Sequence, residues 1–240
     1  MRLVILATAF AAALSGCVTV ESGGTGPAAP STAPAERGPD RISGATAVSN
    51  FRAAVARVEP AAEGVCRQRA PDVNCDFLIR VDPDSRLPAN AYQSLSPQGR
   101  PILTFTQNLI ADARNQDEIA FVIGHESAHH IESHIARQRQ SAAAGALVGG
   151  LIASVAGADA GTVEQISRAG ATVGARSYSK DHELEADALG TIITQRAGYD
   201  PVKGAAFFTR IPDPGDRFLG SHPPNSSRIA TVRRVASQGL

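Results

Sequence analysis

One short motif constrains the fold of this chain more than any other feature: His125–His129, which reads HESAH. Histidines four positions apart project from one face of an α-helix, so both imidazoles can share a metal ion. Glu126 lies about 100° around that helix from His125, where it reaches a metal-bound water without being a ligand. Zinc with few protein ligands keeps an open position for water. The motif therefore predicts a hydrolytic zinc site with ligands His125 and His129 and general base Glu126.

The residues before this motif predict that it lies inside a helix. Asp117 and Glu118 are acidic residues of the kind found in a first helical turn, and the apolar residues Ile119, Val122 and Ile123 follow at helical spacing. Such a helix is mostly buried, and a pair of buried histidines without a ligand would be costly. This argues against the alternative of a surface helix with incidental histidines.

A catalytic zinc ion normally takes a third protein ligand. The extended motif of the metzincins is excluded, because Glu132 and Ile135 stand where it requires glycine and histidine. Glu183 and Asp187 are four residues apart on a second predicted helix. Glu183 could complete a His-His-Glu ligand set, and Asp187 could accept the second ring N–H of a ligating histidine. Taken alone, this pair also fits a solvated acidic face; beside the first motif, the metal interpretation is favoured.

Several other stretches accompany these two motifs. They are NAY at 90–92, DEIAFVIGHESAH at 117–129, SYSK at 177–180, ELEADALG at 183–190, GYDP at 198–201 and SHPP at 221–224. Together they resemble the HtpX-like and CAAX-prenyl-protease-like zinc metallopeptidases, in particular their periplasmic lipoprotein branch. The resemblance covers roughly Asn90 to the C-terminus, and the combination is far more specific than any single motif.

The resemblance implies one zinc ion per chain, held by His125, His129 and Glu183. It also implies Glu126 as general base and Asp187 as a carboxylate behind the ligands. The expected fold is mainly α with a small β-sheet (α+β), a zincin-like metallopeptidase domain whose active-site helix carries the HExxH motif.

Two positions depart from the family pattern. Lys180 stands where the family usually has arginine, and His130 follows the second ligand where an aliphatic residue is commoner. Both lie outside the ligand set, so activity is still expected while substrate preference and local charge are left open. If the helices are regular, His130, His134 and His182 point to other helix faces and stay outside the candidate site.

His222, in the SHPP stretch, has two interpretations. It is a turn histidine with no part in chemistry, or, as the resemblance suggests, it belongs to a loop over the active site. There it would stabilise a tetrahedral oxyanion, or occupy the open position of zinc as a latch. Arg228 would assist the same loop.

The N-terminus reads as an export signal. Residues 3–14 form a run without charge after a single basic residue, too short to span a bilayer comfortably. Small residues then precede Cys17, which resembles a bacterial lipobox and implies a signal peptide at 1–16, cleavage and lipidation of Cys17. An ordinary secretory signal is the alternative. By resemblance to such lipoproteins, Val18 after the cysteine, where aspartate is absent, implies the periplasmic face of the outer membrane.

The remaining chain divides into a tether and one domain. Residues 17–45 are rich in small residues and proline and cannot bury enough surface to fold, whereas 46–240 is long enough for one metallopeptidase domain. With 23 basic and 23 acidic side chains, the composition argues against a nucleic-acid partner. Cys66 and Cys75 most simply form a short disulfide in an oxidising periplasm; buried free thiols or a metal site are the alternatives.

The chain reads as mainly helical. A first helix is predicted from about Ser49 to Gln68, and short strands at Phe77–Val81 and Pro101–Thr106. As a hypothesis, the second strand is an exposed sheet edge that pairs with an extended substrate. Ala142–Ala158 is uncharged but rich in glycine and a poor membrane span, so a flexible or tightly packed helical hairpin is preferred to membrane contact.

These features predict a lipid-anchored periplasmic zinc endopeptidase. By resemblance, its substrates are unfolded, misfolded or stalled outer-membrane proteins, and the outer-membrane assembly machinery is a possible partner. The alternative is a zinc-stabilised periplasmic chaperone or assembly factor with little or no proteolysis. An open coordination position and the retained Glu126 favour chemistry, because a structural zinc needs neither.

Overall fold

A long helix, α1 (Gly44–Arg69), begins the described part of the chain. The computed structural model describes residues 42–177, 179–213, 215 and 222–239, all within one compact unit, Gly38–Leu240. The signal peptide, Cys17 and most of the predicted tether lie outside the described residues. Helix α1 starts earlier than predicted because the Ser43 hydroxyl accepts the Thr46 N–H at 3.2 Å, which is an N-cap.

The sheet has three strands in the order β1-β3-β2: β1 (Leu78–Val81), β2 (Ala91–Leu95) and β3 (Pro101–Phe105). The central strand β3 runs parallel to β1 and antiparallel to β2. The prediction that 101–106 is an exposed edge is therefore wrong. Most of β3 is buried, as expected for a strand covered on both faces, and β1 and β2 form the two edges instead.

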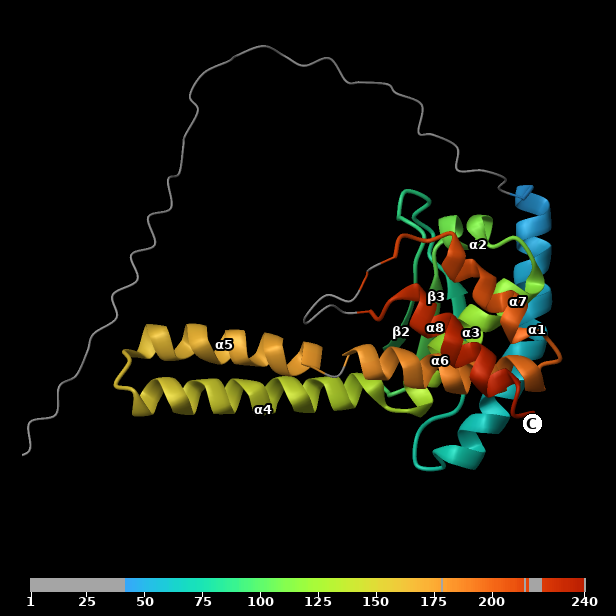
Figure 1. Ribbon diagram of the computed structural model, residues 1–240. Helices are drawn as coiled ribbons and strands as arrows, with labels where there is room; N and C mark the ends of the chain where they lie inside the picture. The colour runs from blue at the N-terminus through green and yellow to red at the C-terminus, as the bar shows by residue number, and fades with distance from the viewer. Residues whose placement is uncertain (1–41, 178, 214, 216–221, 240) are drawn as a thin grey trace, which may run out of the picture. The chain divides into compact units, whose positions relative to one another are not determined.

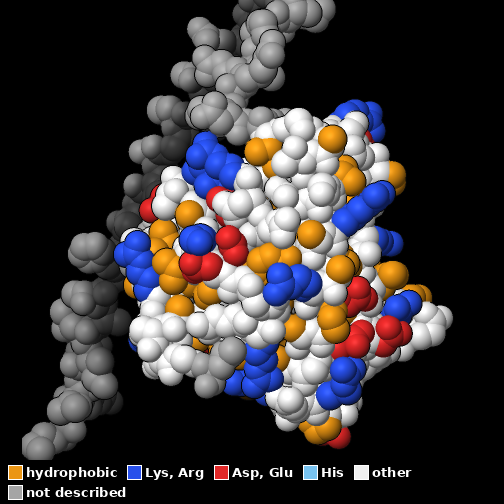
Figure 2. Space-filling model, turned by 90° about the vertical axis from the view of Figure 1, so that its right-hand side faces the viewer, with side chains coloured by type: hydrophobic (Ala, Val, Ile, Leu, Met, Phe, Trp, Pro, Cys, Tyr) orange, Lys and Arg blue, Asp and Glu red, His pale blue; other side chains and the backbone are white. Residues whose placement is uncertain are grey.

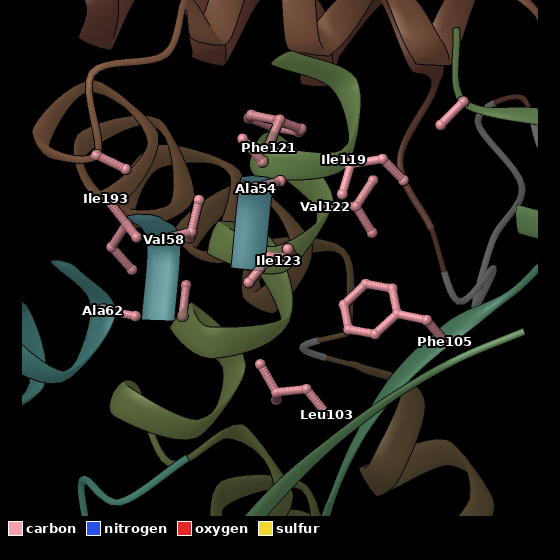
Figure 3. Close-up of a cluster of buried hydrophobic side chains, with 14 of the residues drawn as sticks. Ala54, Val58, Ala62, Leu103, Phe105, Ile119, Phe121, Val122, Ile123 and Ile193 are labelled. Carbon is pink, nitrogen blue, oxygen red and sulfur yellow. The ribbon is translucent and has the colours of Figure 1, made fainter. Parts of the chain in front are cut away.

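The helix that carries the HESAH motif, α3 (Gln116–Ile131), lies at the centre of the core. The Asn115 side chain caps it by accepting the Glu118 N–H at 2.9 Å. Figure 3 shows side chains from α1, α3, β3 and α6 (Ser179–Arg196) packed together in this core. The labelled members are Ala54, Val58, Ala62, Leu103, Phe105, Ile119, Phe121, Val122, Ile123 and Ile193. The motif is thus fixed to the best-packed part of the protein.

Two glycines let α3 and α6 approach closely beside the motif. A Cβ atom on Gly190 would lie 2.9 Å from the backbone nitrogen of His125, and one on Gly124 would lie 2.9 Å from the Gly190 carbonyl oxygen. Contacts this short are not tolerated, so the crossing requires glycine at both positions. This crossing brings the two predicted metal motifs together.

Helices α4 (His134–Val155) and α5 (Ala160–Ser177) lie side by side as a hairpin (Figure 1). Glycines form the seam: a Cβ on Gly145 would lie 2.1 Å from the Gly170 carbonyl oxygen. The sequence favoured a flexible or tightly packed hairpin within 142–158; the structure shows that 142–155 form part of one arm and α5 forms the other. Several large aliphatic side chains of α4 are exposed: Leu147, Val148, Leu151, Ile152 and Val155. Among the described helices, none combines the length and hydropathy needed to cross a bilayer.

The remaining elements are short, apart from α8 (Asn225–Ala236). They are α2 (Gln107–Asp112), α7 (Pro201–Gly204) and the 3-10 helix η1 (Ala205–Thr209). A disulfide joins Cys66 and Cys75, with a Cα–Cα distance of 5.7 Å, so the end of α1 is tied to the segment before β1. On the face shown in Figure 2, basic and acidic side chains are interspersed with small apolar areas. The predicted α+β class is confirmed.

Candidate metal centre

Helices α3 and α6 bring three potential metal ligands together: His125, His129 and Glu183. The two histidine Nε2 atoms are 3.0 Å apart, and they lie 3.6 Å and 3.3 Å from the carboxylate oxygens of Glu183. Tetrahedral zinc with bonds of about 2.0–2.2 Å holds its ligand atoms roughly 3.3–3.6 Å apart. The donor set fits a zinc ion, and so do both histidine–carboxylate distances, whereas the two histidine nitrogens lie about 0.3 Å closer than this range.

The candidate ligands line a large cavity of about 1130 Å³. Glu126, the residue after the first histidine, lines the same cavity and is 8% exposed. Apolar side chains of α3 and η1 form part of the wall, among them Phe121, Phe207 and Phe208. The three ligands thus face a space large enough for water and a polypeptide segment, with Glu126 beside them.

The carboxylate of Asp187 pairs with the second ring nitrogen of His125. The His125 Nδ1 atom is 2.9 Å from Oδ1 of Asp187, which is fully buried. Arg228 of α8 donates to both carboxylate oxygens, from Nε at 2.8 Å and from Nη2 at 2.7 Å. Burial alone would raise the pKa of Asp187, but the paired guanidinium holds it below its usual value. Arg228 therefore acts on the carboxylate behind His125, and not only on the nearby loop as expected.

His134 contacts the second ring nitrogen of His129. Its Nδ1 atom is 2.8 Å from Nδ1 of His129, and its Nε2 atom is 3.0 Å from Oε2 of Glu185. Arg137 donates to the same carboxylate at 2.5 Å, and the ring of His182 stacks on His134 with centroids 4.4 Å apart. Burial lowers the pKa of His134 to about 4, and the Arg137 guanidinium lowers that of Glu185 to about 2.

The expectation that His134 and His182 point away from the site is wrong: His182, on α6, stacks on His134, and His134 is redirected because the chain is not helical just before it. Helix α3 ends at Ile131, and Ser133 takes a left-handed conformation with φ 55° before α4 begins. This break turns His134 back toward the metal face. The expectation holds for His130, which bonds the Asn74 carbonyl at 2.7 Å. A helix-stop signal would have been needed to find His134 from sequence, and no glycine or proline marks the break.

His222 approaches the site from the segment before α8. Its Nδ1 atom is 3.1 Å from Oε2 of Glu183, and its side chain is 53% exposed. Burial opposes ionisation of Glu183, but the contacts with His129 and His222 hold its pKa well below the usual range. His222 is thus brought to the candidate ligands and is not a distant turn residue. Its neighbour Ser221 lies outside the described residues.

Comparison with known proteins agrees with this geometry. Peptidase family M48 matches residues 64–236. A putative beta-barrel assembly-enhancing protease of Vibrio cholerae is 33% identical over 144 residues, covering 54% of this chain and 30% of the relative. Beta-barrel assembly-enhancing proteases of Escherichia coli and Yersinia pestis are 32% and 29% identical, each covering 52% of this chain and 28% of the relative. The matched region thus spans less than a third of these relatives.

Proposed function

The chain belongs to peptidase family M48. We propose that it is a zinc-dependent endopeptidase of the bacterial periplasm. One observation carries the proposal: His125, His129 and Glu183 present their donor atoms within 4.8 Å of one another at the wall of an open cavity. A closed structural site would need a fourth protein ligand and no cavity. The arrangement supports catalysis over a purely structural metal.

Zinc at this site would supply an acidified water and polarise the scissile carbonyl of a peptide. Glu126 accepts a proton from the attacking water and then donates it to the leaving nitrogen. His125 is held in one orientation by Asp187, whose carboxylate Arg228 fixes in turn. Burial of this pair keeps the position of His125 constant through the reaction.

The substrate binds along the edge strand β2. Residues Ala91, Tyr92 and Gln93 of this strand line the cavity, and in the described sheet β2 pairs on one side only, with β3. An extended polypeptide can add to such an edge through main-chain hydrogen bonds. A folded protein offers no free strand of this kind, so unfolded chains are the preferred substrates.

We infer the client class from the names of the relatives, which refer to β-barrel assembly. Misfolded or stalled outer-membrane proteins are the proposed substrates, and the outer-membrane assembly machinery is a proposed partner. Anchoring follows from the lipobox-like sequence: acyl chains on Cys17 would hold the enzyme at the periplasmic face of the outer membrane, with 17–45 as tether. A protease tethered in this way meets unfinished barrels before they insert.

The test is degradation of an unfolded protein, such as reduced and alkylated casein, by wild type and Glu126→Gln. The variant keeps the whole ligand set, so it should bind zinc as wild type does while cleavage falls at least ~10²-fold through loss of the general base. Reduced and alkylated lysozyme should be cut as well, and native lysozyme far more slowly. Full activity of Glu126→Gln would overturn the mechanism, and client binding without cleavage in wild type would favour a chaperone.

A further inference from the structure

Behind each of the two candidate histidine ligands lies a carboxylate that is hydrogen-bonded to an arginine. For His125 the carboxylate is Asp187 and the contact is direct, at 2.9 Å. For His129 the carboxylate is Glu185, and one more side chain, His134, lies between them. The second arrangement is unusual because an imidazole, and not a carboxylate or carbonyl, faces the ligand.

Proton positions along this second chain follow from metal binding. A metal on Nε2 of His129 uses that lone pair, so the ring proton lies on Nδ1. The Nδ1 atom of His134, 2.8 Å away, must then accept a hydrogen bond from this N–H group. The ring proton of His134 itself therefore lies on Nε2. From there it is donated to Glu185 at 3.0 Å. Every hydrogen bond in the chain therefore runs in one direction, toward the carboxylate.

The residues around His134 constrain the orientation of its ring. Its side chain is 5% exposed, and the ring of His182 lies nearly parallel to it, at 13°. Arg137, one turn further along α4, donates to both oxygens of Glu185, at 2.5 Å and 3.3 Å. The imidazole thus has little freedom to rotate or to exchange its two nitrogens.

We propose that His134 is a positioning residue for the metal centre, which fixes the tautomer and ring orientation of His129 through the Glu185–Arg137 pair. The inference rests on the proposed zinc site. A partner that holds the second nitrogen of a histidine raises its basicity as a ligand, and loss of such a partner typically costs about 10–100-fold in metal affinity.

The experiment measures the zinc dissociation constant of the purified protein by competition with a chromophoric chelator. His134→Leu should raise the constant about 10–100-fold. His134→Asn places an amide oxygen near the former Nδ1 and should recover most of the affinity. His130→Leu is the matched control: His130 is also a buried histidine, near the end of α3, but it bonds Asn74, so zinc binding should be unchanged.

A second readout is the visible absorption of the cobalt-substituted protein, which reports the ligand field. His134→Leu should shift this spectrum, whereas His130→Leu should not. Wild-type affinity and spectrum in His134→Leu would overturn the positioning role while leaving the zinc site intact. Absence of zinc from wild type would instead defeat the proposed function. If His134→Leu does not fold, the zinc affinity of Glu185→Ala is measured instead, because the Glu185 side chain is 41% exposed and its loss disturbs the core less. Unchanged zinc affinity in Glu185→Ala would overturn the inference.

Discussion

At the scale of single residues, His222 approaches the candidate ligands from a half-exposed position. Its Nδ1 atom lies 3.1 Å from the carboxylate of Glu183, one of the three candidate ligands. A histidine at this distance can occupy the open position of zinc and exclude water from it. We take the latch as the prediction to test, with stabilisation of an oxyanion as the alternative.

His222→Ala should therefore increase peptidase activity several-fold, because water would gain access to the open position. The measurement is the cleavage rate of an unfolded substrate at equal zinc occupancy of both proteins. A decrease in rate would instead assign His222 to stabilisation of the oxyanion, which typically contributes about 10²–10³ in rate.

The pairing of His125 and His129 could be predicted from sequence because helical spacing fixes it, whereas Glu183 was implied as a ligand by the family resemblance. Spacing of four puts His125 and His129 on one face whatever the rest of the chain does. The same logic failed for His134, because it assumed a regular helix through Ser133. A left-handed serine gives no signal in the sequence, so only the structure reveals the break.

At the scale of elements, the site depends on how closely α3 and α6 cross. Two glycines set this distance, since a Cβ on Gly190 would lie 2.9 Å from the His125 nitrogen and 3.0 Å from its Cα. Both neighbours are backbone atoms, so relief requires the helices to move apart. Glu183 would then move away from the two histidines.

Gly190→Ala should lower the melting temperature and weaken zinc binding together. Gly64→Ala is the matched control, because Gly64 lies inside α1 with open space around its missing Cβ. There alanine should stabilise the protein by about 0.4–1 kcal/mol through reduced entropy of the unfolded chain. Thermal unfolding with and without zinc measures both effects. Equal melting temperatures for Gly190→Ala and wild type would show that the crossing tolerates a side chain.

Element types were easier to predict than their arrangement. Two of the three strands were predicted near their observed positions, but β3 was expected at the edge and lies in the centre. Strand order depends on long-range pairing, which the local pattern of a short strand does not encode. β2 was missed because its sequence, AYQSL, lacks the β-branched residues typical of strands.

At the scale of the whole molecule, the proposed lipid anchor determines where the enzyme works. Cys17 lies outside the described residues, so this part of the account rests on the sequence. Cys17→Ser removes the thiol that would be acylated, so the protein should lose fatty-acid label and leave the membrane fraction. Labelled fatty acid and membrane fractionation measure both. A membrane-bound, labelled variant would show that another residue carries the anchor.

The central claim is that His125, His129 and Glu183 hold one zinc ion with a position open to solvent. X-ray absorption spectroscopy of the purified, zinc-loaded domain tests it most directly, alongside the metal-to-protein ratio. The account predicts one zinc ion per chain with bonds of about 2.0–2.2 Å to nitrogen and oxygen, and two imidazole ligands once His222→Ala removes the latch. A ratio near zero, or a first shell unchanged by Glu183→Ala, would contradict it.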